Sequence, residues 1–192
     1  MKISRLLPRS SAPAIAAIAP LALFVVVSAT GGCSKYNSTD SPELFLPDQN
    51  QFTQAGGVND FLTARCGSLD CHGQIGRPLR LYSANGLRFE DGDGGRRAAG
   101  ATTAAEKKEN YLAVVGLEPE LLSAVAVVAS QGGEFNDLLL FKKPLDIKGG
   151  GVRHKGGPVL RFGDNGWVCL TGWAAGPSKF NKQACEAGAA GQ

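Results

Sequence analysis

Two cysteines and a histidine stand close together in the segment 66–72 of this chain, which reads CGSLDCH. Four residues separate Cys66 from Cys71, and His72 follows the second cysteine directly. Each thiol can add to one vinyl group of a haem, and the adjacent imidazole can then bind the iron. The usual spacing in such motifs is two residues between the cysteines. A chain that carries a macrocycle here has to wrap around it, so this segment constrains the fold strongly.

The first 32 residues have the composition of a secretory signal peptide. Lys2, Arg5 and Arg9 precede an apolar run over 14–27, which is shorter than the roughly 20 residues of a membrane-spanning helix. Small residues then lead to Cys33. A cysteine at that place resembles a bacterial lipoprotein processing site, where the thiol is lipidated. Simple secretion with an ordinary cleavage site is the alternative.

We therefore expect an exported protein, periplasmic or at the cell surface. Ser34 follows the lipidated cysteine where an aspartate would signal inner-membrane retention. The expected location is thus the outer membrane, reached through the lipid anchor.

The chain after residue 32 has no net formal charge, because 17 basic and 17 acidic residues remain. It has no basic cluster interleaved with aromatic residues, so a nucleic-acid partner is not expected. About 160 residues suffice for one domain with a modest core. The whole chain has 26 glycines among its 192 residues, whereas glycine averages about 7% of the residues in proteins. This excess of glycine predicts long irregular connections.

The remaining cysteines predict a disulfide. Of the five cysteines, Cys33 is assigned to the lipid, and Cys66 and Cys71 to the haem. Cys169 and Cys185 are left, and an exported protein can oxidise them to a disulfide. The alternative is that Cys66 and Cys71 pair with each other in a small structural loop.

The histidines restrict how a haem iron could be held. His72 and His154 are the two histidines, and the one methionine is the initiator. The His/Met ligation of many small cytochromes is therefore excluded. His154 is the candidate distal ligand, in a glycine-flanked loop. The alternative is that His154 is an exposed histidine among basic neighbours.

Periodicity predicts a mainly α protein with long glycine-rich loops. Residues 33–57 are polar with two prolines and predict a flexible tether. Helices are expected over 58–65, from Thr102 or Thr103 to about 117, over 120–130 after Pro119, and after Asp164 or Asn165, with a short element over 137–141. Asn59 or Asp60 could cap the first of these. Residues 177–192 predict a polar C-terminal tail.

The order of these elements resembles the single-haem cytochrome c-like domains of exported or lipid-anchored bacterial proteins. The resemblance covers residues 58–176. It includes a cysteine–histidine–glycine step at 71–73, a leucine-rich run into Lys-Pro over 138–145, a His-Lys-Gly-Gly step at 154–157, and a short helix with a tryptophan near its end at 173–176. The resemblance implies one haem c, a small helical fold and electron transfer.

Together these features predict an exported, lipid-anchored mono-haem c-type cytochrome with an unidentified redox partner. Cys66 and Cys71 would attach the haem, with His72 as proximal ligand. Five apolar side chains would pack against it: Leu79, Leu81, Leu140, Phe141 and Trp167. No acid–base pair or hydrolytic triad is visible, so an enzyme is not expected; an open iron site would instead suit a haem peroxidase. The competing hypothesis is a haem-free structural or binding lipoprotein with a Cys66–Cys71 disulfide.

Overall fold

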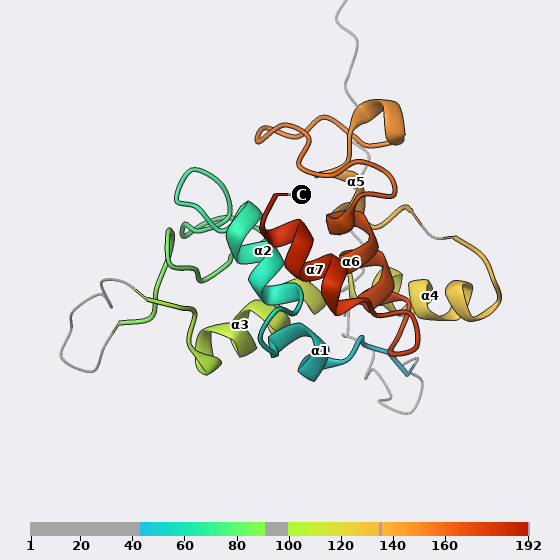
Figure 1. Cartoon of the computed structure of the whole chain (residues 1–192), viewed down its shortest axis with the longest axis horizontal. Helices are drawn as coiled ribbons and strands as arrows, with labels where there is room; N and C mark the ends of the chain where they lie inside the picture. The colour runs from blue at the N-terminus through green and yellow to red at the C-terminus, as the bar shows by residue number, and fades with distance from the viewer. Residues whose placement is uncertain (1–42, 91–99, 135, 192) are drawn as a thin grey trace, which may run out of the picture. The chain divides into compact units, whose positions relative to one another are not determined.

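The computed structural model describes residues 43–90, 100–134 and 136–191. The expected signal peptide, the lipidation site Cys33 and the first part of the expected tether lie outside the described residues. Figure 1 shows the arrangement of the described elements.

The described part of the chain is mainly helical, which confirms the predicted fold class. Two isolated bridges, Tyr82 with Leu87 and Leu145 with Leu160, are its β-pairings. No single described helix is long and apolar enough to cross a membrane; α3 and α4 pass that test together only as a pair bent by 82°. The helices are α1 (Gln49–Thr53), α2 (Val58–Cys66), α3 (Ala104–Val115), α4 (Pro119–Ser130), α5 (Leu139–Lys142), α6 (Asn165–Ala174) and α7 (Lys182–Ala189), with a 3-10 turn at Ile147–Gly149.

Helix starts follow local chemistry in three of the predicted cases. Thr103 and Glu106 form a capping box at the start of α3, Pro119 occupies the first turn of α4, and Asp164 accepts a hydrogen bond from the Trp167 N–H at the start of α6. The expected cap of α2 is wrong. That helix starts after Gly57 without a side-chain cap, because Asn59 is turned into the core.

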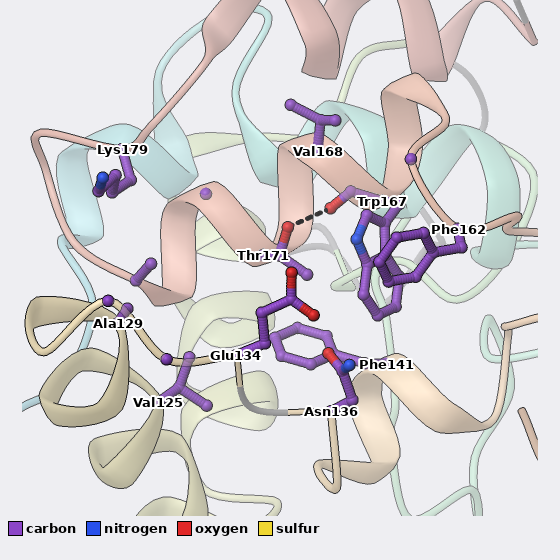
Figure 2. Close-up of a pocket in the computed structure, with 15 residues that line it drawn as sticks. Val125, Ala129, Glu134, Asn136, Phe141, Phe162, Trp167, Val168, Thr171 and Lys179 are labelled. Atoms are coloured by element: carbon purple, nitrogen blue, oxygen red, sulfur yellow. Dashed lines mark hydrogen bonds between the residues drawn. The ribbon is translucent and has the colours of Figure 1, made fainter. Parts of the chain in front are cut away.

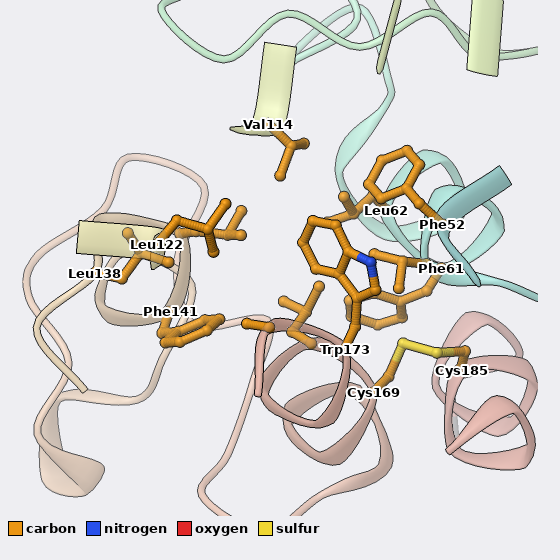
Figure 3. Packing of buried hydrophobic residues seen from close by; sticks show 14 of the residues in the cluster. Phe52, Phe61, Leu62, Val114, Leu122, Leu138, Phe141, Cys169, Trp173 and Cys185 are labelled. Atoms are coloured by element: carbon orange, nitrogen blue, oxygen red, sulfur yellow. A yellow bond between two sulfur atoms is a disulfide. The ribbon is translucent and has the colours of Figure 1, made fainter. Parts of the chain in front are cut away.

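The core forms where α2, α6 and α7 pack together (Figure 1). Trp173 is fully buried at its centre, with its ring centroid 5.2 Å from that of Phe52 (Figure 3). The disulfide Cys169–Cys185 links α6 to α7, and both cysteines are fully buried. The predicted pairing is therefore confirmed.

The expected tether (33–57) and the expected C-terminal tail (177–192) each contain a helix that packs on the core. Within the expected tether, α1 places Phe52 in the core, and the Trp173 indole N–H donates to the Asp48 carbonyl at 2.9 Å. Within the expected tail, α7 buries Ala184 and Cys185 against α2 and α6. Both helices are short, and their folding depends on these contacts more than on local sequence.

A buried amide ties the segment after the cysteine–histidine motif to two helices. The Asn110 side chain, on α3, donates to Asn59 of α2 at 2.8 Å and to the Tyr82 carbonyl at 2.9 Å. It also accepts from the Tyr82 N–H at 2.7 Å. Asn59 and Asn110 are fully buried, so each lost hydrogen bond would leave a polar group without water.

One turn earlier on α3, Glu106 is a fully buried carboxylate held by several donors. Arg88 donates to it at 2.8 and 3.1 Å, and the backbone N–H groups of Phe89 and Thr103 donate at 3.0 and 2.8 Å. Burial alone would raise the pKa of Glu106, but these hydrogen bonds outweigh it and lower the pKa to about 2. The ion pair thereby fixes segment 88–89 to α3.

Glu106→Gln should lower the free energy of unfolding by about 3–5 kcal/mol at neutral pH, because it leaves the buried Arg88 guanidinium uncompensated. The folded pKa of about 2 lies below the ordinary 4.5. The stabilisation is therefore complete above pH 4.5 and is lost as pH falls toward 2. Urea denaturation across this range should show the difference between wild type and variant narrowing toward low pH. Glu120→Gln, on the exposed surface of α4, is the control; parallel curves for wild type and Glu106→Gln would contradict the assignment.

Candidate functional site

The cysteine–histidine motif folds into a closed turn at the C-terminal end of α2. The His72 N–H donates to the Cys66 carbonyl at 2.9 Å, so the two ends of the motif meet. The N–H groups of Cys71 and Gly73 both donate to the Ser68 carbonyl, at 3.0 and 2.8 Å. The four residues between the cysteines are therefore part of a hydrogen-bonded turn.

Three glycines allow this turn to pack closely on the following segment. A Cβ added to Gly73 or to Gly86 would collide with the Gly67 carbonyl oxygen, and one on Gly73 would also lie 2.8 Å from the Gly86 Cα. The Ser83 hydroxyl donates to the same Gly67 carbonyl. All of these neighbours are backbone atoms or short side chains. The place where Gly67, Gly73 and Gly86 meet, which we call the crossing, therefore has no room for a larger side chain.

His72 is oriented by a backbone group. Its Nδ1 lies 2.8 Å from the Leu79 carbonyl oxygen, a position in which a neutral imidazole donates its Nδ1–H and leaves Nε2 with a free lone pair. The Leu81 N–H donates to the His72 carbonyl at 2.8 Å, which fixes the backbone as well. This is the arrangement typical of metal-binding histidines, whose second nitrogen donates to a carbonyl or carboxylate.

His154 lies beside His72, although 82 positions separate them in the sequence. The centroids of the two rings are 5.9 Å apart and their planes differ by 17°. The Nδ1 of His154 lies 3.4 Å from the Gly157 carbonyl oxygen. Both imidazoles therefore direct Nδ1 to a backbone oxygen, and within the described residues no other group hydrogen-bonds to either Nε2.

The surroundings of His72 favour its neutral form. Burial lowers the pKa of His72, and electrostatic coupling to His154 and the charges of Arg77 and Lys143 act in the same direction, against the effect of the Leu79 carbonyl. The neutral imidazole is the form that binds a metal ion. His72 is therefore held in the form in which the Nε2 lone pair is available.

Cys66 and Cys71 are both free thiols in the structure, and both are partly exposed. Burial raises the pKa of the Cys66 thiol to about 12, and the neighbouring Cys71 adds to this effect against the charge of Arg65. A thiol that stays protonated is a poor nucleophile and a poor metal ligand. Cys66 is therefore unsuited to act as a thiolate in the folded chain.

The five apolar side chains expected to contact a haem are all buried in the one hydrophobic core of the described residues. Leu79 and Leu81 flank the segment that orients His72, while Phe141 and Trp167 line a separate cavity of about 500 Å³ (Figure 2). That cavity lies among α4, α5 and α6, and none of Cys66, Cys71, His72 and His154 lines it. The structure thus brings the two histidines together, and the cavity that Phe141 and Trp167 line does not include them.

Backbone groups at this site could not be identified from the sequence. The Leu79 carbonyl orients His72, and any residue at position 79 would supply the same carbonyl. Arg77 and Lys143 act on His72 through their charge. The Lys-Pro step at 143–144 was part of the family resemblance, and it is the one sequence signal that pointed to Lys143.

Among the described residues, no three His, Cys, Asp or Glu side chains converge on a point where they could hold a metal ion. Comparisons with protein-family models, with curated proteins and with solved structures find no match for this chain. The candidate site accordingly depends on its own geometry.

Gly73→Ala should destabilise the protein by about 1–3 kcal/mol or more, since the new methyl group has only backbone to displace. Gly149→Ala is the matched control, because a Cβ there would meet nothing closer than 3.7 Å. Thermal unfolding of both variants measures the difference. Equal melting temperatures for the two variants would show that the turn is not packed as described.

Proposed function

We propose that this protein is an exported mono-haem c-type cytochrome that carries electrons. Cys66 and Cys71 would attach the haem by thioether bonds, His72 would be the proximal ligand of its iron, and His154 the distal ligand. A bound haem c would supply one-electron redox chemistry at its iron. The chain would anchor at the outer membrane through a lipid on Cys33.

The observation that carries this proposal is the pairing of His72 with His154. With metal–nitrogen bonds of about 2 Å and about 1 Å from each nitrogen to its ring centre, two imidazoles whose Nε2 atoms faced each other across one metal ion would have centroids about 6 Å apart. The observed separation is 5.9 Å, with nearly parallel rings. A haem iron needs at most two ligands from the protein, so two histidines suffice where a bare metal ion would require more.

The chain's own residues support the same assignment. The Leu79 carbonyl holds Nδ1 of His72, and the Gly157 carbonyl faces Nδ1 of His154, so Nε2 is the available nitrogen of both rings. Cys66 and Cys71 are unpaired, so both thiols could form thioethers. Because burial raises the pKa of Cys66 in the folded chain, its attachment would have to precede folding. The turn that joins the two cysteines keeps His72 next to the point of attachment. Ligation and burial by these residues would set the redox potential.

Replacing Cys66, Cys71 or both by serine should weaken or abolish covalent haem staining, because each thioether joins one thiol to one vinyl group. The protein is made in a host with a cytochrome c maturation system, and a denaturing gel is stained for haem. Asp70→Asn, at an exposed position in the same turn, is the control and should stain like wild type. Unchanged staining of the double variant would contradict the attachment, and an unstained wild type would favour the haem-free lipoprotein.

His154→Ala should convert a six-coordinate, low-spin ferric protein into a high-spin form that binds cyanide readily. The reduction potential of the wild type should lie below that of His/Met cytochromes, because a thioether ligand raises the potential. Absorption spectra and a redox titration measure both. Lys155→Ala, exposed in the same loop, should leave the spectrum unchanged. A wild type that is already high-spin would exclude His154 as a ligand and favour a haem enzyme with an open site.

A further inference from the structure

The charges of the folded part are unevenly distributed with respect to the two histidines. We name residues 66–80 and 142–157 the histidine loops, since they carry His72 and His154. These loops contain seven basic and two acidic residues, a formal charge of +5, whereas the other described residues contain seven basic and twelve acidic ones, a formal charge of −5. The chain after residue 32 therefore has no net formal charge although its positive charges are concentrated in the histidine loops.

Most of the basic side chains in the histidine loops are exposed to solvent and have no acidic partner in the described part of the chain. Lys142 pairs with Asp137 at 2.6 Å, but Lys143, Lys148, Arg153 and Lys155 are exposed and form no ion pair within the described residues. One of the two acids in the loops, Asp146, uses its carboxylate to accept the Lys148 backbone N–H.

The two loops lie against each other, so their charges add at one place. The His72 and His154 rings are 5.9 Å apart, and the charges of Lys143 and Arg77 both act on the His72 ring. The Val152 N–H also donates to the Lys142 carbonyl at 3.0 Å, which folds the second loop back on itself. Cations from both loops therefore lie near the histidine pair.

The same loops expose apolar side chains. Ile75 and Ile147 are 75% and 67% exposed, and Leu69 and Val152 are also exposed. Exposed apolar groups among cations are typical of a protein–protein interface, in which an apolar centre is surrounded by a charged rim. A surface that bound only small anions would not need exposed apolar side chains.

We propose that the histidine loops form the docking surface for an acidic redox protein, an inference that rests on the electron-transfer function proposed above. Carboxylates of the partner would face Lys143, Lys148, Arg153 and Lys155, and its apolar groups would contact Ile75 and Ile147. The partner would dock beside the histidine pair, where one electron passes between the two redox centres and no bond is made or broken. Complementary charge would raise the association rate at low ionic strength.

The binding test uses oligoglutamate as the acidic probe and the full processed protein, labelled with ¹⁵N. Chemical-shift changes should be confined to the histidine loops and should disappear as salt is added. The double variant Lys143→Glu/Lys155→Glu should bind the probe at least about tenfold more weakly. Lys108→Glu/Lys179→Glu changes the net charge equally at two exposed positions outside the loops and should bind as wild type does. Shifts elsewhere, or equal weakening in both double variants, would overturn the docking surface.

The redox test uses the haem-loaded protein with two small oxidants of opposite charge. Reduced protein should pass one electron to ferricyanide faster at low than at high ionic strength, and to a cationic cobalt complex more slowly at low ionic strength. Lys143→Glu/Lys155→Glu should weaken both trends, because it lowers the formal charge of the histidine loops from +5 to +1. Tighter binding to anionic phospholipid vesicles than to oligoglutamate would overturn the proposal in favour of a membrane surface. Failure of haem staining would defeat the proposed function, yet the oligoglutamate result would still report on the surface independently.

Discussion

The position of the candidate site depends on one buried amide. Asn110 bonds to α2 through Asn59 and to both backbone groups of Tyr82, using three hydrogen bonds in an environment without water. The cysteine–histidine turn starts at the end of α2 and the segment that orients His72 ends at Tyr82. Asn110 therefore fixes the two ends of the site-bearing segment relative to each other. The Glu106–Arg88 pair continues this attachment one turn away on α3.

The second half of the site is held differently. His154 lies in a glycine-rich loop between Leu145 and Leu160, which pair with each other in an isolated bridge. This bridge closes the loop and positions His154, which lies on no α-helix. The first histidine is thus firmly oriented by a short hydrogen bond to a carbonyl at 2.8 Å, and the second more loosely at 3.4 Å. The two halves of the candidate site thus differ in how firmly the backbone orients their imidazoles.

Local sequence signals were sufficient to predict much of the fold. Thr103, Pro119 and Asp164 marked helix starts because caps and first-turn prolines act within a few residues, and counting cysteines paired Cys169 with Cys185. The short helices α1 and α7 were not predicted, because their stability comes from distant partners such as Trp173 for Phe52. The histidines of the site could be named from composition. Their orienting carbonyls and the Asn110 network could not, because backbone acceptors and buried amides leave no pattern in a sequence.

The crossing of Gly67, Gly73 and Gly86 has a consequence for how this chain can change over evolutionary time. Within the spacer between the cysteines, the Gly67 and Ser68 carbonyls both accept hydrogen bonds. Shortening the spacer to the usual two residues would therefore disturb this turn and the close packing of Gly67, Gly73 and Gly86. Gly76, by contrast, has no atom within 4 Å of an added Cβ, and Ile75 beside it points outward. The backbone around Gly76 therefore has room to change length, whereas the cysteine–histidine motif does not.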